Sequence, residues 1–378
     1  LQSEQLGTGH AVSQAKSALA GCTGDVIILY GDTPFVRPET LQSLSAARKT
    51  ADIVVLGFDA GDPGRYGRLV MQGAAVSRIV EYKDASEQER AITFCNSGVI
   101  CAKAEVLFSL LEVVGNDNAS GEYYLTDIVQ LANDRNLSVA AVHCDEAETM
   151  GINSRAELAQ AEASFQTRTR AEMMALGVSL TAPETVYFAY DTVLGRDSQI
   201  EPNVVFGPGV TVENSAHIRA FSHLEGCHVS SGAVVGPYAR LRLGTELAEN
   251  VRIGNFVEVK NARIEDGAKV NHLSYIGDAN IGEASNIGAG TITCNYDGVG
   301  KHHTEIGASV FIGSNTMLVA PVTVGDDAMT ASGSVITKDV EPGALAIARS
   351  EQGNKPGLAI KLFAMLRRRK AKQQERLL

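Results

Sequence analysis

The chain has 378 residues, of which 44% are hydrophobic, and this length exceeds one typical folding unit. Its net charge of -11 argues against a nucleic-acid partner, because binding to phosphates requires a basic surface. No apolar run of about eighteen residues and no signal peptide is recognisable, so we expect a cytoplasmic protein without membrane insertion. The six cysteines form no CxxC pair, which is typical of reduced thiols and argues against structural zinc.

Apolar strands and helical segments alternate in residues 1–153. We expect a strand over residues 25–30, a helix over 39–49 and a second strand over 52–58, which together predict an α/β domain with buried parallel strands. Asp32 follows the first strand, at the edge where open α/β sheets bind ligands. Asp32 is therefore either a metal ligand or an ordinary turn residue that caps the next segment.

A helix is expected next, over a linker of residues 154–180. Ser154 and Glu157 have the spacing of a capping box, and Gly177 supplies a stop signal. The linker separates the α/β domain from a second domain of different composition.

In this second domain, residues 181–345, an aliphatic residue recurs every six positions. Few interruptions break the series, and Thr330 is its single polar member: Ile200, Phe206, Val212, Ile218, Leu224, Val229, Val235, Leu241, Leu247, Ile253, Val259, Ile264, Val270, Ile276, Ile281, Ile287, Ile306, Ile312, Leu318, Val324, Thr330 and Ile336. This period predicts a three-sided parallel β-helix in which each side uses one hexapeptide.

Glycine often follows the aliphatic position, and we interpret these glycines as tight corners between the sides: Gly236, Gly254, Gly277, Gly282, Gly288, Gly307, Gly313 and Gly325. Residues 346–378 form a C-terminal tail or helix. The basic run 367–370 in this tail is interpreted as a solvated helix end, or alternatively as a contact with an acidic partner subunit.

Several short motifs in residues 1–153 together resemble the sugar-1-phosphate nucleotidyltransferases. They lie at residues 5–11, 29–32, 66–68, 81, 96–98 and 121–127. Joined to a hexapeptide domain, they resemble the bacterial bifunctional family that combines N-acetylglucosamine-1-phosphate uridylyltransferase with glucosamine-1-phosphate acetyltransferase. The resemblance implies a Rossmann-like first domain, a left-handed β-helix and a homotrimer.

The resemblance also implies a uridylyltransferase site that uses UTP and Mg²⁺. Its expected UDP-sugar-binding residues are Gln2, Gly7, Thr8, Tyr30, Gly31, Asp32, Gly67, Glu81, Asn96 and Asn153. Asp32 and Asn153 would hold the metal, since Mg²⁺ prefers oxygen ligands and retains waters. The glycine-rich loop that grips the triphosphate in this family would precede Leu1, so we expect no uridylyl transfer from the chain as written and both activities from a longer parent protein.

The acetyltransferase signature is the sequence from Gly288 to Gly298, which lies where the six-residue period breaks between Ile287 and Ile306. A projecting loop is expected there, and loops on rigid scaffolds often carry function. The resemblance makes His272 the general base for the amine of glucosamine-1-phosphate. Taken alone, a histidine in a β-helix wall is more often structural.

The other implied residues of this site surround the sugar phosphate and acetyl-CoA. Sugar-phosphate binding is expected of Arg242, Lys260, Glu258, Tyr275 and Asn286. Acetyl-CoA binding is expected of Ala289, Asn295, Tyr296, Ser314, Ser332, Arg349 and Lys301, the last from a neighbouring subunit. Arg242 and Lys260 are eighteen residues apart, so their charges should stack on successive coils. Leu243 and Ser332 replace the proline and alanine usual in the family.

These expectations imply acetylation of glucosamine-1-phosphate followed by uridylylation of N-acetylglucosamine-1-phosphate. The product, UDP-N-acetylglucosamine, would supply peptidoglycan and lipopolysaccharide synthesis. Two other functions stay open. The first is a non-catalytic regulatory or assembly subunit, and the second is a zinc hydratase that draws on His217, His223, His228, His272, His302 and His303.

Overall fold

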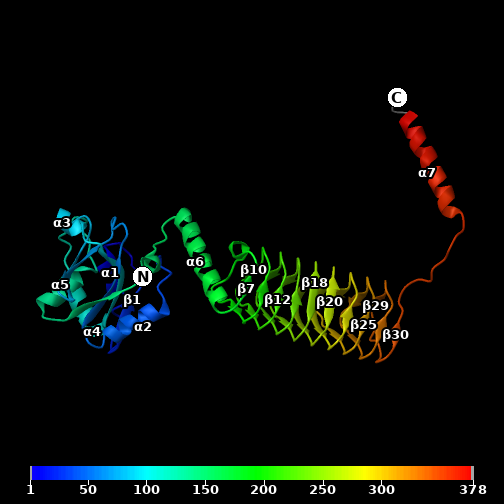
Figure 1. Cartoon of the computed structure of the whole chain (residues 1–378), viewed down its shortest axis with the longest axis horizontal. Coiled ribbons are helices and arrows are strands. Elements are labelled where there is room, and N and C mark those ends of the chain that lie inside the picture. The colour runs from blue at the N-terminus through cyan, green and yellow to red at the C-terminus, as the bar shows by residue number, and fades with distance from the viewer. Residues whose placement is uncertain (1, 376–378) are drawn as a thin grey trace. The chain divides into compact units, whose positions relative to one another are not determined.

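The computed structural model describes residues 2–375, and its internal contacts divide the chain into two units, Leu1–Ala163 and Ser164–Leu378. The division falls inside helix α6 (Arg155–Ala175), the helix predicted in the linker (Figure 1). Each unit is described separately below.

The first unit contains a six-stranded sheet with strand order β4-β3-β5-β2-β6, and β1 pairs with β5. The strands are β1 (Asp25–Ile28), β2 (Ile53–Asp59), β3 (Arg68–Gln72), β4 (Ala75–Val80), β5 (Phe94–Lys103) and β6 (Val139–His143). The two strands expected from the sequence are therefore present as β1 and β2.

The expectation of parallel strands in this sheet is wrong for most strand pairs. Of the pairs in the sheet, β2 and β6 are parallel, whereas β5 runs antiparallel to β1, β2 and β3, and β3 runs antiparallel to β4. The ten-residue strand β5 lies between β1 and β2 and opposes both, so the sheet is mixed. The apolar runs in the sequence do not predict the order or the direction of the strands.

Helices cover both faces of the sheet. They are α1 (Thr8–Ser13), α2 (Pro38–Ala47), α3 (Glu87–Arg90), α4 (Ala104–Leu111), α5 (Asp127–Asp134) and the 3-10 helix η1 (Glu146–Thr149). Successive residues of β2 point to opposite faces, as strand geometry requires. Ile53 and Val55 pack with residues of α4 and α5, while Val54 and Leu56 pack against Leu44 of α2.

Helix α6 begins with a cap close to the predicted one. The Ser154 hydroxyl accepts the backbone N–H of Glu157 at 3.2 Å. The Glu157 carboxylate accepts the backbone N–H of Asn153 at 2.6 Å. A capping box would instead use the backbone N–H of Ser154, one residue later. Gly177, with a left-handed φ of 94°, follows the end of the helix and is the predicted stop.

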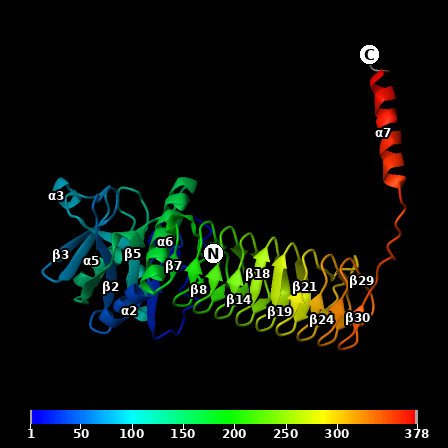
Figure 2. The same cartoon turned by 45° about the vertical axis from the view of Figure 1, so that its right-hand side comes forward.

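The second unit is a parallel β-helix with three faces (Figure 2). The first face is a ten-stranded sheet of β7 (Ser179–Leu180), β9 (Gln199–Ile200), β12 (His217–Ile218), β15 (Val234–Val235), β18 (Arg252–Asn255), β20 (Lys269–His272), β22 (Asn286–Ile287), β25 (Phe311–Ile312), β28 (Met329–Thr330) and β30 (Leu345–Ala346). A short 3-10 helix, η2 (Pro183–Thr185), precedes the regular coils.

The other strands make the second and third faces, and β19 and β21 bend from one face to the other. The second face contains β10 (Val205–Phe206), β13 (His223–Leu224), β16 (Arg240–Leu241), β23 (Ile292–Cys294), β26 (Met317–Val319) and β29 (Val335–Ile336), with the first halves of β19 (Glu258–Ile264) and β21 (Tyr275–Ile281). The third face contains β8 (Val193–Leu194), β11 (Thr211–Val212), β14 (Cys227–Val229), β17 (Thr245–Leu247), β24 (Thr304–Ile306) and β27 (Val322–Val324), together with the second halves of β19 and β21.

Every position of the predicted six-residue series is buried in the β-helix. The strand register places residues 17 or 18 apart directly above one another, as in the pairs Ile200 with Ile218 and Leu241 with Val259. The polar exception, Thr330, is also buried, and its hydroxyl accepts the backbone N–H of Gly313 at 3.0 Å. Burial of this hydroxyl is tolerated because it is hydrogen-bonded.

The predicted corner positions are confirmed for most of the repeat glycines, and Gly254 and Gly277 instead lie within strands. Gly236 alone among them has a left-handed φ, 97°. Several of the others, including Gly254, Gly282, Gly288 and Gly313, face the backbone of the next coil, whereas Gly277 faces the side chains of Tyr275 and Asn295. A Cβ on Gly254 would overlap the carbonyl oxygen of Asn271, and one on Gly288 would lie 2.5 Å from that of Ile312. These glycines therefore permit close stacking of coils rather than left-handed backbone.

The corners carry left-handed residues of other types. Phe221, Tyr238, Phe256 and Leu273 follow one another along the corner between the first and second faces, each with φ between 52° and 60°. The three aromatic rings stack with centroid separations of 4.8 and 5.4 Å. We call these four residues the aromatic corner.

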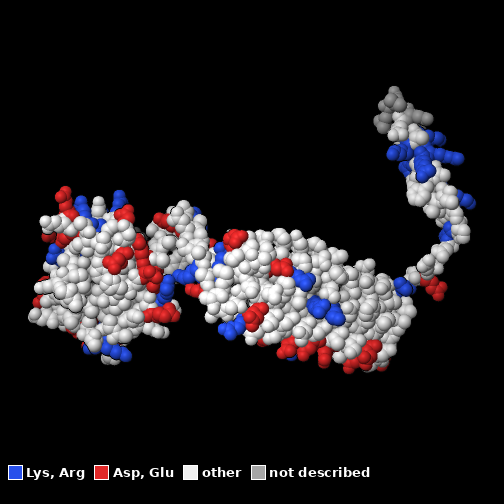
Figure 3. Space-filling model, viewed as in Figure 1, with Lys and Arg blue, Asp and Glu red and all other residues white. Residues whose placement is uncertain are grey.

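Helix α7 (Leu358–Glu375) follows the β-helix and contains the basic run 367–370. Its described side chains are exposed, and Lys and Arg gather along it in Figure 3. Within residues 2–375, no helix is both long and apolar enough to cross a membrane.

Candidate active sites

A cavity of about 480 Å³ opens in the first unit beside the end of β1. Seven of the ten residues predicted to bind a UDP-sugar line it: Thr8, Tyr30, Asp32, Gly67, Glu81, Asn96 and Asn153. They come from segments far apart in the sequence, and the mixed sheet brings them together.

Two predicted metal ligands, Asp32 and Asn153, line this cavity together. The backbone N–H of Ile152 donates to the carbonyl oxygen of Asp32 at 2.9 Å, which holds the segment containing Asn153 against the turn after β1. Both side chains offer oxygen ligands, and Mg²⁺ commonly takes only one or two ligands from a protein. The donor set therefore fits Mg²⁺.

Two half-buried titratable residues, Glu81 and Tyr30, also line the cavity. Burial raises the pKa of Glu81, although a hydrogen bond from the Thr126 hydroxyl at 3.1 Å opposes this shift. Burial, with repulsion from Glu81 and Asp32, also raises the pKa of the Tyr30 phenol. The Tyr30 ring packs over Gly98, whose φ is 87°, so a side chain at position 98 would displace the ring. These groups can donate and accept hydrogen bonds with the hydroxyls of a sugar.

Three predicted UDP-sugar residues, Gln2, Gly7 and Gly31, do not line the cavity. The Gln2 amide contacts His10 Nδ1 at 2.9 Å. Gly7 precedes α1, and a Cβ there would lie 2.6 Å from the Tyr123 carbonyl oxygen. Gly31 lies between Tyr30 and Asp32 in the turn.

On the β-helix, His272 ends strand β20 and is exposed. Its Nδ1 lies 3.0 Å from Oδ1 of Asn255, the residue directly below it in the register. An amide oxygen can only accept, so Nδ1 carries the hydrogen, and Nε2 of the neutral ring keeps its lone pair. The sequence reasoning missed Asn255, although its position 17 residues before His272 is a usable signal in a β-helix.

Three predicted acetyl-CoA residues continue the row of His272. Backbone hydrogen bonds join Gly290 to His272, Asn315 to Ala289, and Gly333 to Ser314, so Ala289, Ser314 and Ser332 stack on successive coils beyond the histidine. The Arg349 guanidinium donates to the Ser332 carbonyl oxygen at 2.9 Å. A long, thin ligand could lie along this row.

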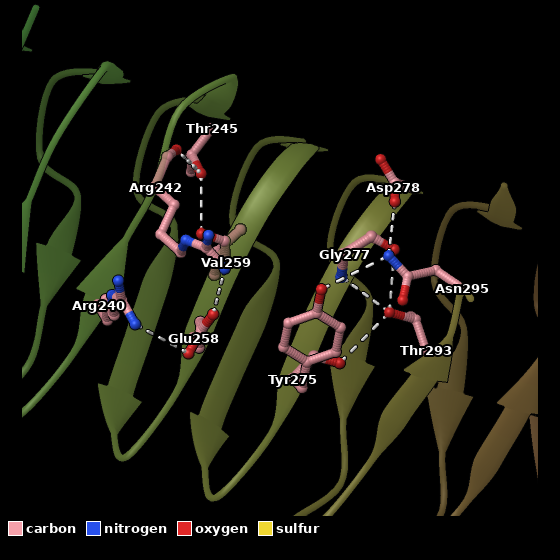
Figure 4. A network of polar contacts seen from close by, with 10 residues as sticks. All are labelled: Arg240, Arg242, Thr245, Glu258, Val259, Tyr275, Gly277, Asp278, Thr293 and Asn295. Atoms are coloured by element: carbon pink, nitrogen blue, oxygen red, sulfur yellow. Dashed lines mark hydrogen bonds and ion pairs between the residues drawn. The ribbon is translucent and has the colours of Figure 1, made fainter. Parts of the chain in front are cut away.

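Four of the five predicted sugar-phosphate residues lie on or at the end of the adjoining second face, and Figure 4 shows three of them, Arg242, Glu258 and Tyr275. Arg240, Glu258 and Tyr275 stack in register, and Lys260 stacks on Gly277 in the next row. The Glu258 carboxylate binds the Arg242 guanidinium at 2.9 Å and lies 3.8 Å from that of Arg240. Nε of Arg242 is buried and has no hydrogen-bond partner within the described residues, so one donor remains for a ligand.

Lys301 lies beside Lys260 of the same chain. Contact with the Lys301 ammonium, followed by desolvation and the charge of Arg242, lowers the pKa of Lys260. Cations grouped in this way favour binding of an anion, and Asp278 of the same chain supplies one negative charge close by. The structure thus groups Lys301 with the phosphate candidates, while the expected contact with acetyl-CoA of a neighbouring subunit stays a prediction.

The loop of the acetyltransferase signature is held by Asp297. This carboxylate accepts from His302 Nε2 at 2.7 Å and from the backbone N–H groups of Gly300 and Val299 at 2.7 and 2.8 Å. These contacts, His302 first, lower the pKa of Asp297. Tyr296 is 61% exposed on this loop, and its hydroxyl donates to the Gly298 carbonyl oxygen at 2.7 Å.

Asn286 is not grouped with the other sugar-phosphate candidates within one chain. It belongs to β22 of the first face, between Lys269 and Phe311 in the register. Its expected role stays a prediction.

The histidines considered for zinc are mostly occupied by carboxylates. His217 pairs with Glu201 at 2.8 Å, His228 with Glu213 at 2.9 Å, and His303 with Glu305 at 3.2 Å. Across the described part of the chain, no group of three or more His, Cys, Asp or Glu side chains is arranged to hold a metal. One chain therefore offers no assembled three-histidine site in residues 2–375.

Comparison with known proteins decides the family. Residues 303–338 match the family described as Bacterial transferase hexapeptide (six repeats). The Bifunctional protein GlmU of a Ruegeria species is 71% identical over 371 residues, covering 98% of this chain and 83% of the relative. The chain belongs to the bifunctional GlmU family.

Other curated relatives agree. The Bifunctional protein GlmU of Ruegeria pomeroyi is 71% identical, covering 99% of this chain and 83% of the relative, and that of a Jannaschia species is 64% identical, covering 97% and 81%. A solved UDP-glucose pyrophosphorylase aligns with 44% of this chain and 64% of its own at 14% identity, and its TM-score of 0.35 is too low to support an argument.

Membership confirms the family predicted from the motifs, an acetyltransferase and uridylyltransferase with a hexapeptide β-helix. It disfavours the non-catalytic subunit and the zinc hydratase.

Proposed function

We propose that the second face of the β-helix binds glucosamine-1-phosphate and transfers an acetyl group to its amine from acetyl-CoA. The observation that carries this proposal is the convergence of Arg242, Lys260 and Lys301 one corner away from His272. The cations would bind the phosphate, with Arg242 supplying its unpaired Nε–H. The sugar amine would then face the histidine.

His272 would act as the general base through Nε2. It accepts a proton from the amine as the nitrogen attacks the thioester carbonyl carbon of acetyl-CoA, and a C–N bond forms. The Ser314 hydroxyl, in the same row as His272, would stabilise the oxyanion of the tetrahedral intermediate. Collapse of the intermediate breaks the C–S bond, and the departing thiolate takes the proton from the imidazolium.

Thiol release from acetyl-CoA, with and without glucosamine-1-phosphate, tests this function. We expect release that requires the sugar phosphate and that falls by about 10²–10⁴-fold in His272→Ala, the usual contribution of a general base. His228→Ala is a matched control, because His228 lies on the third face and pairs with Glu213. No release from the folded wild-type chain, or full activity in His272→Ala, would overturn the assignment.

We further propose that the cavity of the first unit binds the uridine nucleotide and N-acetylglucosamine-1-phosphate. Asp32 and Asn153 would hold Mg²⁺, which neutralises charge as the sugar phosphate attacks the uridylyl phosphorus and pyrophosphate leaves. Glu81 and Asn96 would orient the sugar. The product would be UDP-N-acetylglucosamine, the precursor expected for the cell envelope.

Binding of UDP-N-acetylglucosamine, measured by calorimetry, tests this cavity. We expect Mg²⁺ to strengthen binding in the wild type, and EDTA or Asp32→Ala to remove that gain. Asp62→Ala is a control, since Asp62 is also an aspartate of the first unit but does not line the cavity. If Mg²⁺ strengthens binding equally in Asp32→Ala, Asp32 is not a ligand.

We also propose a cytoplasmic homotrimer. Phe221, Tyr238, Phe256 and Leu273 of the aromatic corner are 47–59% exposed beside the His272 row, and a second copy would cover them and flank the row of acetyl-CoA candidates. Light scattering should give three times the chain mass. The cytoplasmic location rests on acetyl-CoA and UTP as substrates and on six free cysteines.

A further inference from the structure

Three polar residues, Asn261, Asp278 and Asn295, form a ladder at the corner between the second and third faces. They are spaced 17 residues apart, the length of one coil. The Asp278 carboxylate accepts from Nδ2 of Asn261 at 2.6 Å through one oxygen and from Nδ2 of Asn295 at 2.5 Å through the other. Figure 4 shows the contact with Asn295, which lies within the acetyltransferase signature Gly288–Gly298.

We propose that Asp278 is a positioning residue of the acetyltransferase, fixing the Asn295 amide so that its oxygen presents an acceptor to the bound substrates. This inference rests on the proposed function. Because Nδ2 of Asn295 is engaged by Asp278 and lies 3.5 Å from the Tyr275 hydroxyl, Oδ1 is the end that remains for a ligand. An acceptor there suits a sugar hydroxyl or an amide N–H of the pantetheine arm.

The backbone of this corner does not by itself require an aspartate. Asp278 has a left-handed φ of 48°, but Asn203, Asn250 and Asn315 adopt the same conformation at other corners. A carboxylate is needed because two N–H donors converge on it from the coils on either side. An asparagine could accept from one of them, and its own NH₂ would then face the other donor.

The surroundings of Asp278 give it a second effect. The residue is only 8% exposed, and Lys260 and Lys301 lie close enough to favour its charged form. Its charge therefore offsets part of the repulsion between the two ammonium groups. Removal of this charge should leave phosphate binding as strong as before or stronger, while the amide of Asn295 loses its orientation.

Asp278→Asn separates these effects through kcat and KM. We expect kcat for acetyl transfer to fall by about tenfold or more, as for a misplaced substrate contact, with KM for glucosamine-1-phosphate unchanged or lower. A merely structural role would raise KM and lower the melting temperature together. Asp327→Asn is the matched control, because Asp327 also has a left-handed φ, 56°, but lies at the corner between the third and first faces.

A double-mutant cycle tests the route through Asn295. If Asp278 acts by orienting that amide, Asp278→Asn in an Asn295→Ala background should lower kcat no further. A folded Asp278→Asn variant with wild-type kcat, or additive losses in the double variant, would overturn the inference. Wild-type protein that transfers no acetyl group would instead refute the proposed function, so the two failures are distinguishable.

Discussion

The two units assemble their sites by opposite routes. In the β-helix, one coil takes 17 or 18 residues, so Asn255 lies below His272 and Arg240 below Glu258 simply because of their spacing. In the α/β unit, Asp32 and Asn153 meet only because the chain folds back across a mixed sheet. A solenoid thus converts sequence distance into spatial position directly, whereas a mixed sheet does not.

The largest expected effect tests whether the two sites are chemically separate. His272→Ala should abolish nearly all acetyl transfer, by about 10²–10⁴-fold, and leave binding of UDP-N-acetylglucosamine unchanged. Glu81→Gln should do the reverse, since its half-buried carboxyl lines the cavity of the other unit. On the same preparations, thiol release measures acetyl transfer and calorimetry measures binding of UDP-N-acetylglucosamine. Loss of both properties in either variant would contradict independent sites.

A second prediction separates close packing from backbone strain in the β-helix. Gly254→Ala should destabilise this unit by about 3 kcal/mol, because the new Cβ would overlap the Asn271 carbonyl group. Gly267→Ala should cost only about 1 kcal/mol, since it has a left-handed φ of 67° but open space for a Cβ. Urea unfolding followed by circular dichroism provides the comparison. Equal losses would mean that coil stacking does not govern these glycines.

The same contrast between the two units explains how much of the fold could be predicted from the sequence. The six-residue period identified every inward side chain of the series, including Thr330, because stacking leaves no other place for them. The close contacts of Gly254 and Gly288 were not predictable from one strand, because the atoms that they meet belong to the next coil. In the α/β unit, β1 and β2 were predicted but not their partner β5, because strand order depends on contacts between distant segments.

The candidate sites show the same limit. Asp32, Glu81 and Asn153 were expected through family resemblance, and no spacing rule would have placed them in one cavity. Asn255 and Asp278 were missed although the coil length points to both, as residues one coil from His272 and Asn295. A search one coil above and below each motif residue would have found them.

A smaller effect is expected at the residue that orients the histidine. Asn255→Asp would place a carboxylate 3.0 Å from Nδ1 of His272 and stabilise the protonated ring. The acid limb of the kcat/KM profile should therefore move to higher pH, by about one pH unit. Asn255→Ala should lower kcat/KM without that shift. An unchanged profile in a folded Asn255→Asp variant would mean that Asn255 does not contact the base during turnover.

The smallest predicted effect compares the two units through one thiol each, Cys227, which is buried, and Cys144, which is half-buried. Burial raises the pKa of Cys227 in the β-helix and of Cys144 in the α/β unit to about 12 in each case. Because the folded pKa lies above that of the unfolded chain, the stability contributed by each neutral thiol is present below about pH 8.5 and is lost as the pH rises toward 12. Raising the pH from about 8 to 10 should therefore lower the melting temperature of each unit by a few degrees.

The decrease in melting temperature should be smaller for the β-helix in Cys227→Ala and for the α/β unit in Cys144→Ala. Each variant is compared with its own melting temperature at the lower pH, so that the effect of the cavity left by the substitution cancels. If Cys227→Ala reduces the alkaline shift of both units equally, the units unfold together, and the separation drawn from their contacts does not extend to their stability.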